Sequence, residues 1–247
     1  MIKLVKIILP SLSRANQADP IFYTLEKDTK IYRIFTKKYY SSALSFRYWG
    51  PLHRFDHQRG NPPRSDYKAR KCQPCEDRER GICYVAPKFS SCLVEVFGDI
   101  PEAAEITEEH LFAILTAKRD LKLLDIRNNG AMRAGANDAT LAKTNRRIVT
   151  QAWSRLFYEY EAKYPEIYGI IYGNAHNNED AIAFYERGKK HFNCKQEDVL
   201  SLADPDLRRY VLSAAKDNNL KVIFPEWSES TDLQHFKRVI YSYGTRI

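Results

Sequence analysis

Residues 81–97 have the sequence GICYVAPKFSSCLVEVF, and this stretch gives the clearest indication of the fold. Residues 82–86 form an apolar run rich in β-branched and aromatic residues, which predicts a strand. The second half predicts a short helix from about Ser91 to Phe97. The stretch therefore joins a strand directly to a helix that carries one acidic residue, Glu95.

Strands and helices mix along the rest of the chain without strict alternation. A doubly wound parallel sheet would alternate them more regularly, so the order predicts an α+β fold with a mixed, largely antiparallel sheet and flanking helices. Three more helices are expected, over residues 107–117, over residues 145–164 and from Asp204, a plausible N-cap before Pro205. In residues 145–164 apolar residues repeat at three- and four-residue steps, which predicts one buried stripe along the helix. Further strands are expected at residues 3–9, 31–35, 121–126, 167–173, 182–185 and 220–224.

Composition limits the class of protein. The 247 residues are 44% hydrophobic and 13% aromatic, which is typical of a folded domain, and we expect a single domain over residues 1–247. The apolar run near the amino terminus is too short for a signal peptide or a membrane span, so we expect a cytoplasmic protein with no membrane partner. Five cysteines indicate reduced thiols rather than a disulfide framework.

The segment 56–81 is interpreted as a charged loop inserted at the surface, because it holds seven Lys or Arg and five Asp or Glu. Cys72 and Cys75 form a Cys-x-x-Cys turn within it, and Cys83 or His57 could complete a zinc site. Zinc knuckles usually have two such pairs, so free thiols are the favoured interpretation and no required metal is expected.

The net charge of +8 favours anionic partners without choosing among them. Short basic clusters stand at residues 146–147, 189–191 and 208–209 and could form a nucleic-acid surface. No base-reading motif accompanies them, so solvated helix faces are the more common explanation.

Four segments taken together resemble the RES family, named for an Arg, a Glu and a Ser, whose members are NAD-degrading toxins or ADP-ribosyltransferases. The resemblance covers about residues 32–185, and it leaves residues 193–247 as a carboxy-terminal extension. The family's signature Ser corresponds to Asn174 in this sequence. The matching segments are YRI at 32–34, WGPLHRF at 49–55, residues 81–97 with Tyr84 and Glu95 eleven positions apart, and YGIIYGNA at 168–175.

The resemblance implies an ADP-ribosyltransferase-like RES fold and a catalytic group of Glu95, Arg33 and Asn174. A carboxylate beside the anomeric carbon opposes the positive charge that develops on ribose, and this role falls to Glu95. Asn174 would orient Glu95 or the nicotinamide ribose. Without the resemblance, Glu95 would be interpreted as the solvated side of an amphipathic helix.

The same resemblance implies that NAD, the substrate, is bound by Arg33, Arg54, Tyr84 and His176. Two arginines can hold a pyrophosphate through paired hydrogen bonds, and the face of Tyr84 can stack on nicotinamide. His176 would line the mouth of the pocket. The alternatives are surface arginines, a core tyrosine and a turn histidine.

The function implied is that of an NAD glycohydrolase that releases nicotinamide and ADP-ribose, with a toxin role and a small antitoxin partner as family possibilities. If a protein or nucleic acid traps the ribosyl cation instead of water, the enzyme is an ADP-ribosyltransferase. The alternative that is not an enzyme is a module that binds nucleic acid or protein. In that case, zinc bound by Cys72 and Cys75 would hold the module's loop together. The sequence does not predict the oligomeric state.

Overall fold

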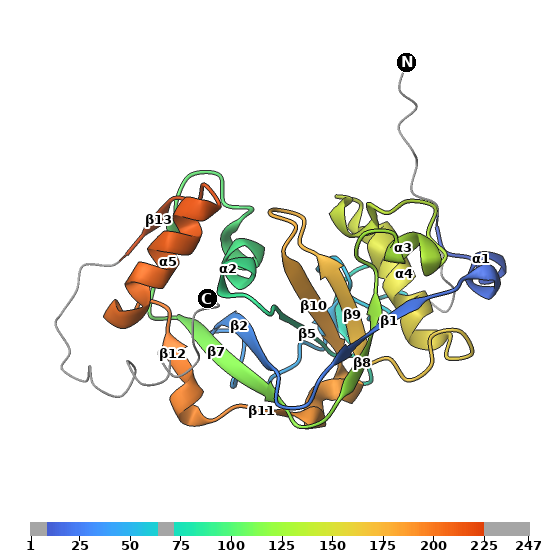
Figure 1. Cartoon of the computed structure of the whole chain (residues 1–247), viewed down its shortest axis with the longest axis horizontal. Helices are drawn as coiled ribbons and strands as arrows, with labels where there is room; N and C mark the ends of the chain where they lie inside the picture. Colours follow the sequence, from blue (N-terminus) through green and yellow to red (C-terminus); the bar gives the residue numbers. More distant parts are fainter. Residues whose placement is uncertain (1–8, 64–71, 225–247) are drawn as a thin grey trace, which may run out of the picture.

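The computed structural model describes residues 9–63 and 72–224 and confirms the α+β class. Two mostly antiparallel sheets pack face to face, and helices cover their outer faces (Figure 1). The amino-terminal strand expected at residues 3–9 lies almost wholly outside the described residues. None of the described helices is long and apolar enough to span a bilayer.

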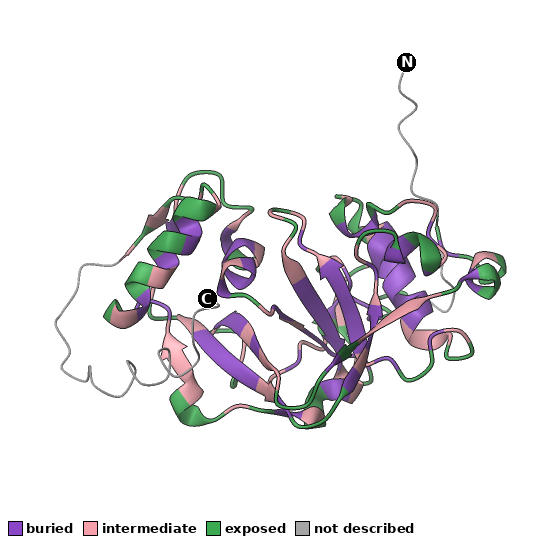
Figure 2. Ribbon diagram, viewed as in Figure 1, coloured by how far each residue is buried: buried purple, intermediate pink, exposed green. Residues whose placement is uncertain are grey.

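The larger sheet contains the strand from residues 82–86. β8 (Leu121–Asp125) and β9 (Gly169–Gly173) pair in parallel, and every other neighbouring pair in this sheet is antiparallel. Two of its three interior strands, those at residues 169–173 and 180–185, are buried along most of their length (Figure 2). The order across the sheet is β1 (Ile21–Leu25), β8 (Leu121–Asp125), β9 (Gly169–Gly173), β10 (Asp180–Tyr185) and β5 (Ile82–Val85).

The second sheet corrects a prediction, because residues 107–117 are not helical. All but the first three of them form β7 (His110–Ala117), which has β2 (Lys30–Thr36) on one edge and two short strands on the other. Residues 112–115 are all buried, so this continuous apolar run belongs to a strand covered on both faces. The remaining strands are β2 (Lys30–Thr36), β11 (Phe192–Asn193) and β12 (Val199–Ser201).

Three helices form the outer layers. α4 (Arg147–Glu159) covers one face of the larger sheet, and Val149, Trp153 and Leu156 are fully buried there, as the predicted stripe requires. The helix ends at Glu159, several residues before Pro165. α2 (Phe89–Phe97) and α5 (Pro205–Asp217) cover the second sheet, and Asp204 caps α5 as predicted.

Short elements complete the fold. The strand expected at residues 220–224 is reduced to β13 (Val222–Ile223), which pairs in parallel with β6 (Ala104–Glu105). The other short elements are α1 (Leu12–Gln17), α3 (Gly130–Arg133), the 3₁₀ helices η1 (Leu141–Lys143), η2 (Glu186–His191) and η3 (Gln196–Asp198), and the pair β3 (Trp49–Gly50) and β4 (Cys75–Glu76).

The segment 56–81 differs from a surface loop at both ends. Asp56, His57 and Gln58 have no exposed surface, and Arg80 is 4% exposed. Buried charged groups need partners, and Arg80 has one in Glu159, 2.6 Å away. The ends of the charged segment are therefore part of the packed structure, and residues 64–71 lie outside the described part.

Candidate active site

Glu95 lies on α2, where the helix packs against the second sheet. Its side chain is half-buried, and the hydroxyl of Tyr172 on β9 donates a hydrogen bond of 3.3 Å to Oε1. Arg54 and His176 lie close enough to act on the carboxylate electrostatically. The fold thus brings an arginine from one distant segment, and a tyrosine and a histidine from another, to a single carboxylate.

Burial raises the pKa of Glu95, although Arg54, His176 and the Tyr172 hydroxyl all act to lower it. Burial and the neighbouring Glu95 carboxylate together raise the pKa of Tyr172 well above its ordinary value. Tyr172 therefore stays protonated and donates its hydrogen bond. The carboxylate is held in a partly desolvated setting with positive charge nearby, where electrostatic interactions are stronger than in water.

The loop that carries Arg54 is held by α4. Three consecutive carbonyl oxygens of this loop, those of residues 53–55, accept side-chain hydrogen bonds from the helix. Gln151 donates to His53 at 3.0 Å and Ser154 donates to Phe55 at 2.7 Å, while Thr150 donates to Arg54. Side chains on one helix face can contact consecutive loop residues in this way, so α4 fixes the path of the loop.

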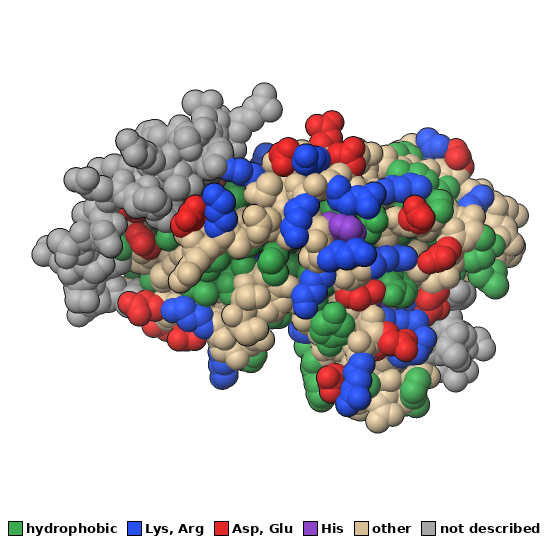
Figure 3. Space-filling view, turned by 90° about the horizontal axis from the view of Figure 1, so that it is seen from below, with side chains coloured by type: hydrophobic (Ala, Val, Ile, Leu, Met, Phe, Trp, Pro, Cys, Tyr) green, Lys and Arg blue, Asp and Glu red, His purple; other side chains and the backbone are tan. Residues whose placement is uncertain are grey.

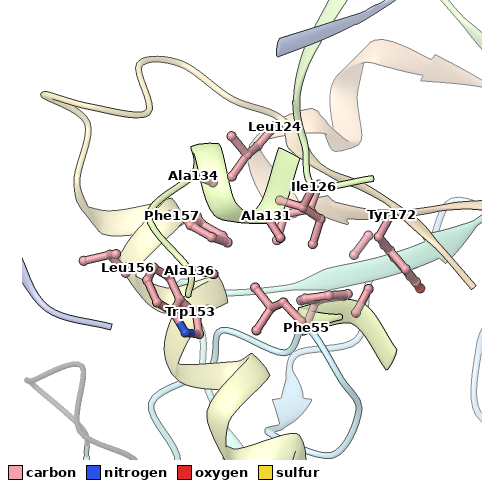
Figure 4. Close-up of a cluster of buried hydrophobic side chains, with 14 of the residues drawn as sticks. Phe55, Leu124, Ile126, Ala131, Ala134, Ala136, Trp153, Leu156, Phe157 and Tyr172 are labelled. Atoms are coloured by element: carbon pink, nitrogen blue, oxygen red, sulfur yellow. The ribbon is translucent and has the colours of Figure 1, made fainter. Parts of the chain in front are cut away.

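The Phe55 side chain completes the attachment of this loop. Its ring lies 4.7 Å from that of Tyr172, and Figure 4 shows the two rings side by side in the cluster that includes Trp153. The hydroxyl of Tyr172 points away from the labelled core side chains (Figure 4). Aromatic packing on one side and the α4 hydrogen bonds on the other leave little freedom to residues 53–55.

The carboxylate of Asp56 also holds this loop in place, by accepting hydrogen bonds from several of its neighbours. Its fully buried carboxylate accepts two hydrogen bonds of 2.8 Å from Arg47, one of 2.8 Å from the His53 amide, one from the Leu52 amide and one of 2.9 Å from the Tyr84 hydroxyl. The Tyr84 hydroxyl therefore binds the protein rather than facing Glu95. The Tyr84 ring packs edge to face against His53, with 5.9 Å between ring centroids.

Two arginines, Arg54 and Arg147, lie at the candidate site or beside it. Arg54 donates to the carbonyl oxygen of Thr144 and acts on Glu95. Arg147, at the start of α4, is half exposed and lies 3.4 Å from the carbonyl oxygen of Leu52 and 3.8 Å from the carboxylate of Asp99. Asp99 also lies 3.7 Å from His176.

Arg33 is not at Glu95. The side chain is 3% exposed, and its Nη1 donates to the carbonyl oxygens of Ala43 at 2.5 Å and Ser45 at 2.7 Å. The guanidinium also lies over the ring of Tyr40, 4.7 Å from its centroid. Successive residues of β2 face opposite sides of the sheet, so Arg33 points away from the side on which α2 packs.

Asn174 and His176 form a turn after β9. Asn174 is fully buried; its Nδ2 donates to the Ser91 carbonyl oxygen at 3.3 Å, and its Oδ1 accepts from the His176 amide at 2.8 Å. A Cβ at Gly98 would lie 2.8 Å from Nδ1 of His176, so the absent side chain makes room for the imidazole. Asn174 therefore shapes the turn that presents His176, and its side chain makes no hydrogen bond to Glu95 among the described contacts.

Several residues of the arrangement were missed by sequence reasoning: Arg47, His53, Asp56, Asp99, Arg147 and Tyr172. Two of these lie inside quoted motif segments, His53 beside Arg54 and Tyr172 two positions before Asn174. Tyr172 was missed because an aromatic residue in a strand usually indicates core packing. Its neighbour Glu95 lies 77 positions away in sequence.

The structure places both of the side chains that were expected to complete a zinc site, those of Cys83 and His57, elsewhere. Cys83 is buried in the core between the two sheets, and Nε2 of His57 lies 3.0 Å from the carboxylate of Glu186. Neither side chain joins Cys72 and Cys75, and the described residues contain no group of three or more side chains able to hold a metal ion. All five cysteines are free thiols.

A basic surface lies on another side of the molecule. Burial, and then the charges of Arg119, Lys190 and Lys118, lower the pKa of His191. Figure 3 shows the lower face, where Lys and Arg side chains gather around a histidine. The predicted cluster at residues 189–191 belongs to this surface, whereas Arg147 lies near the candidate site.

Comparisons with known proteins give one structure and one family. The crystal structure of the M. tuberculosis MbcT-MbcA toxin-antitoxin complex matches with a TM-score of 0.48 and 15% sequence identity, covering 82% of this chain and 96% of that chain. No curated protein matches at the significance applied. The family model of the RES domain matches residues 30–209, which takes in the start of the segment first interpreted as an extension. Because this match spans well over half of the sequence, the chain belongs to the RES domain family.

Proposed function

We propose that the chain breaks the bond between nicotinamide and ribose in NAD, with Glu95 as the carboxylate that stabilises the ribosyl cation. The observation that carries the proposal is the setting of Glu95, half-buried and held by a single tyrosine hydrogen bond beside Arg54 and His176. Such a carboxylate keeps acceptor capacity for a ligand, which a fully hydrogen-bonded carboxylate would lack.

The chemistry needs few groups. The C–N bond breaks, its electron pair stays on the nicotinamide nitrogen, and nicotinamide leaves as a neutral molecule. The oxygen of water then bonds to the ribose carbon and releases a proton, which gives ADP-ribose. Glu95 opposes the charge on ribose in between, while Arg54 and Arg147 are placed to bind the pyrophosphate.

The family resemblance supports the same reaction, and it also supports a toxin role in the cytoplasm with a small antitoxin as partner. A protein or nucleic-acid acceptor in place of water would make the enzyme an ADP-ribosyltransferase. The basic face around His191 favours an acidic acceptor for that variant of the reaction.

The test is NAD consumption and nicotinamide release by the purified protein, beside Glu95→Gln and Arg54→Ala variants shown to be folded. Turnover that both variants lose would support the proposal. A mass increase of a macromolecule in place of free ADP-ribose would identify the transferase. An inactive wild type, with nucleic acid and cell lysate offered as acceptors, would contradict both forms of the proposal.

A further inference from the structure

A groove of about 730 Å³ lies beside the candidate active site. Its walls are unusually aromatic, and Trp49 and Tyr39 at its rim are 54% and 71% exposed. Large exposed aromatic side chains around a hollow are typical of binding surfaces rather than of ordinary protein surface. The aromatic lining consists of Tyr39, Tyr40, Phe46, Tyr48, Trp49 and His53.

The groove is built on a rigid base. Arg33 lies under Tyr40 and holds the carbonyl oxygens of Ala43 and Ser45, so the loop that forms one wall is fixed by a buried cation. Arg47 lines the opposite wall, donates to the Trp49 carbonyl oxygen at 2.5 Å and pairs with Asp56. The two arginines therefore hold the backbone on which the groove is built.

The groove and Glu95 lie on either side of the loop that carries Arg54. Leu52 and His53 line the groove, and the next residue, Arg54, acts on Glu95. Arg147 stands at the junction, in contact with the Leu52 carbonyl oxygen and near Asp99. A ligand that reaches from Glu95 into the groove therefore passes two arginines.

We propose that this aromatic groove binds the adenine ring of the dinucleotide. The inference rests on the proposed function, which puts the nicotinamide end at Glu95 and the pyrophosphate at Arg54 and Arg147. The far end of such a substrate is a flat aromatic base, which stacks on aromatic side chains. Glu76 on the groove wall offers an acceptor for the adenine amino group.

The test compares two substrates, NAD and nicotinamide mononucleotide, which has the same scissile bond but no adenylate. Trp49→Ala should raise KM for NAD by roughly tenfold, because stacking of one base on one aromatic ring contributes about that factor. It should leave kcat for NAD, and both constants for the mononucleotide, unchanged. Leu212→Ala, which removes an exposed apolar side chain on α5, is the matched control.

A second measurement does not depend on turnover. In a Trp227→Phe background, AMP should quench the tryptophan fluorescence and should fail to do so when Trp49 is also changed to phenylalanine, because Trp153, the remaining tryptophan, is fully buried elsewhere. Equal effects of Trp49→Ala on both substrates, or none on either, would overturn the groove assignment while leaving the reaction intact. If the wild type turns over neither substrate, the proposed function fails, and AMP quenching alone then decides whether the groove binds adenylate.

Discussion

Glu95 and Glu186 are two partly buried carboxylates that each accept a hydrogen bond from a tyrosine, yet their pKa values are shifted in opposite directions. Glu186 accepts from Tyr158 at 2.7 Å and from the Gly81 amide at 3.1 Å, and it lies 3.0 Å from Nε2 of His57. Within the described part of the chain, Glu95 accepts one side-chain hydrogen bond, from Tyr172. A carboxylate has about four acceptor positions, so Glu186 is nearly saturated and Glu95 is not.

The pKa shifts follow from this difference. Burial acts to raise the pKa of both groups, and in Glu95 it prevails. In Glu186 the hydrogen bond and charge of His57, together with Tyr158, outweigh burial and lower the pKa. A carboxylate whose acceptor positions are filled serves stability, whereas one with positions left open beside cations is suited to a substrate.

The largest expected effect is on catalysis at Glu95. Glu95→Gln should lower kcat by about 10²–10³-fold, the usual result of removing one group that stabilises transition-state charge. The thermal midpoint should not fall, because the folded state already disfavours the ionised form of Glu95. Nicotinamide release and thermal unfolding give the two values, and Glu108→Gln, an exposed change, is the control.

The reverse result is expected at Glu186. Glu186→Gln breaks a buried cluster with His57 and should lower the free energy of unfolding by about 2–4 kcal/mol. Denaturant unfolding measures this loss, and kcat per folded molecule should stay within about twofold. An inactive variant with wild-type stability would contradict the division of roles between the two carboxylates.

As pH is lowered, the loss of activity and the loss of stability should occur at different pH values, because different carboxylates control them. Glu95 must be ionised to act, so kcat should fall as pH decreases through its raised pKa, above the ordinary value of about 4.3 for Glu. Because the folded pKa of Glu186 is lowered, its stabilisation is present above the unfolded pKa and is lost only as pH falls through the lower folded value. Activity should therefore disappear at a higher pH than stability.

Tyr172→Phe sharpens this test. Loss of the hydroxyl removes a hydrogen bond that lowers the pKa of Glu95, so the acid limb of kcat should move to higher pH. Tyr164→Phe is the control, because that buried hydroxyl bonds only the Ala134 carbonyl oxygen. An acid limb that is the same in wild type and Tyr172→Phe would show that a group other than Glu95 controls the profile.

The smallest effect is expected at Asn174. Asn174→Ala removes two hydrogen bonds, to Ser91 and His176, and should lower stability by about 1–2 kcal/mol and kcat a few-fold. Asn174→Ser, which restores the residue of the family signature, should be closer to wild type. A loss of kcat beyond a hundredfold in folded Asn174→Ala would mean that this side chain contacts the substrate directly.

Local patterns predicted much of the fold. The strand and helix of residues 81–97, the buried stripe of α4 and the cap of α5 follow from short-range periodicity and capping chemistry. The prediction of a helix over residues 107–117 was wrong, because a run that is apolar throughout fits a buried strand as well as a buried helix. The pairing of β7 with strands on both edges, which no local pattern records, decided the outcome.

The α+β class, and the strand followed directly by the helix that carries Glu95, could be predicted from the sequence alone. Tertiary structure decided the rest of the site. In the folded protein, Arg33 binds loop carbonyl oxygens and the Tyr84 hydroxyl binds Asp56, so neither group faces Glu95. The packing of the layers also places Tyr172 against Glu95, and Arg147 beside the loop that carries Arg54. The physical reason is that spacing along a chain fixes which face a side chain occupies, whereas contacts between distant segments depend on how whole layers pack.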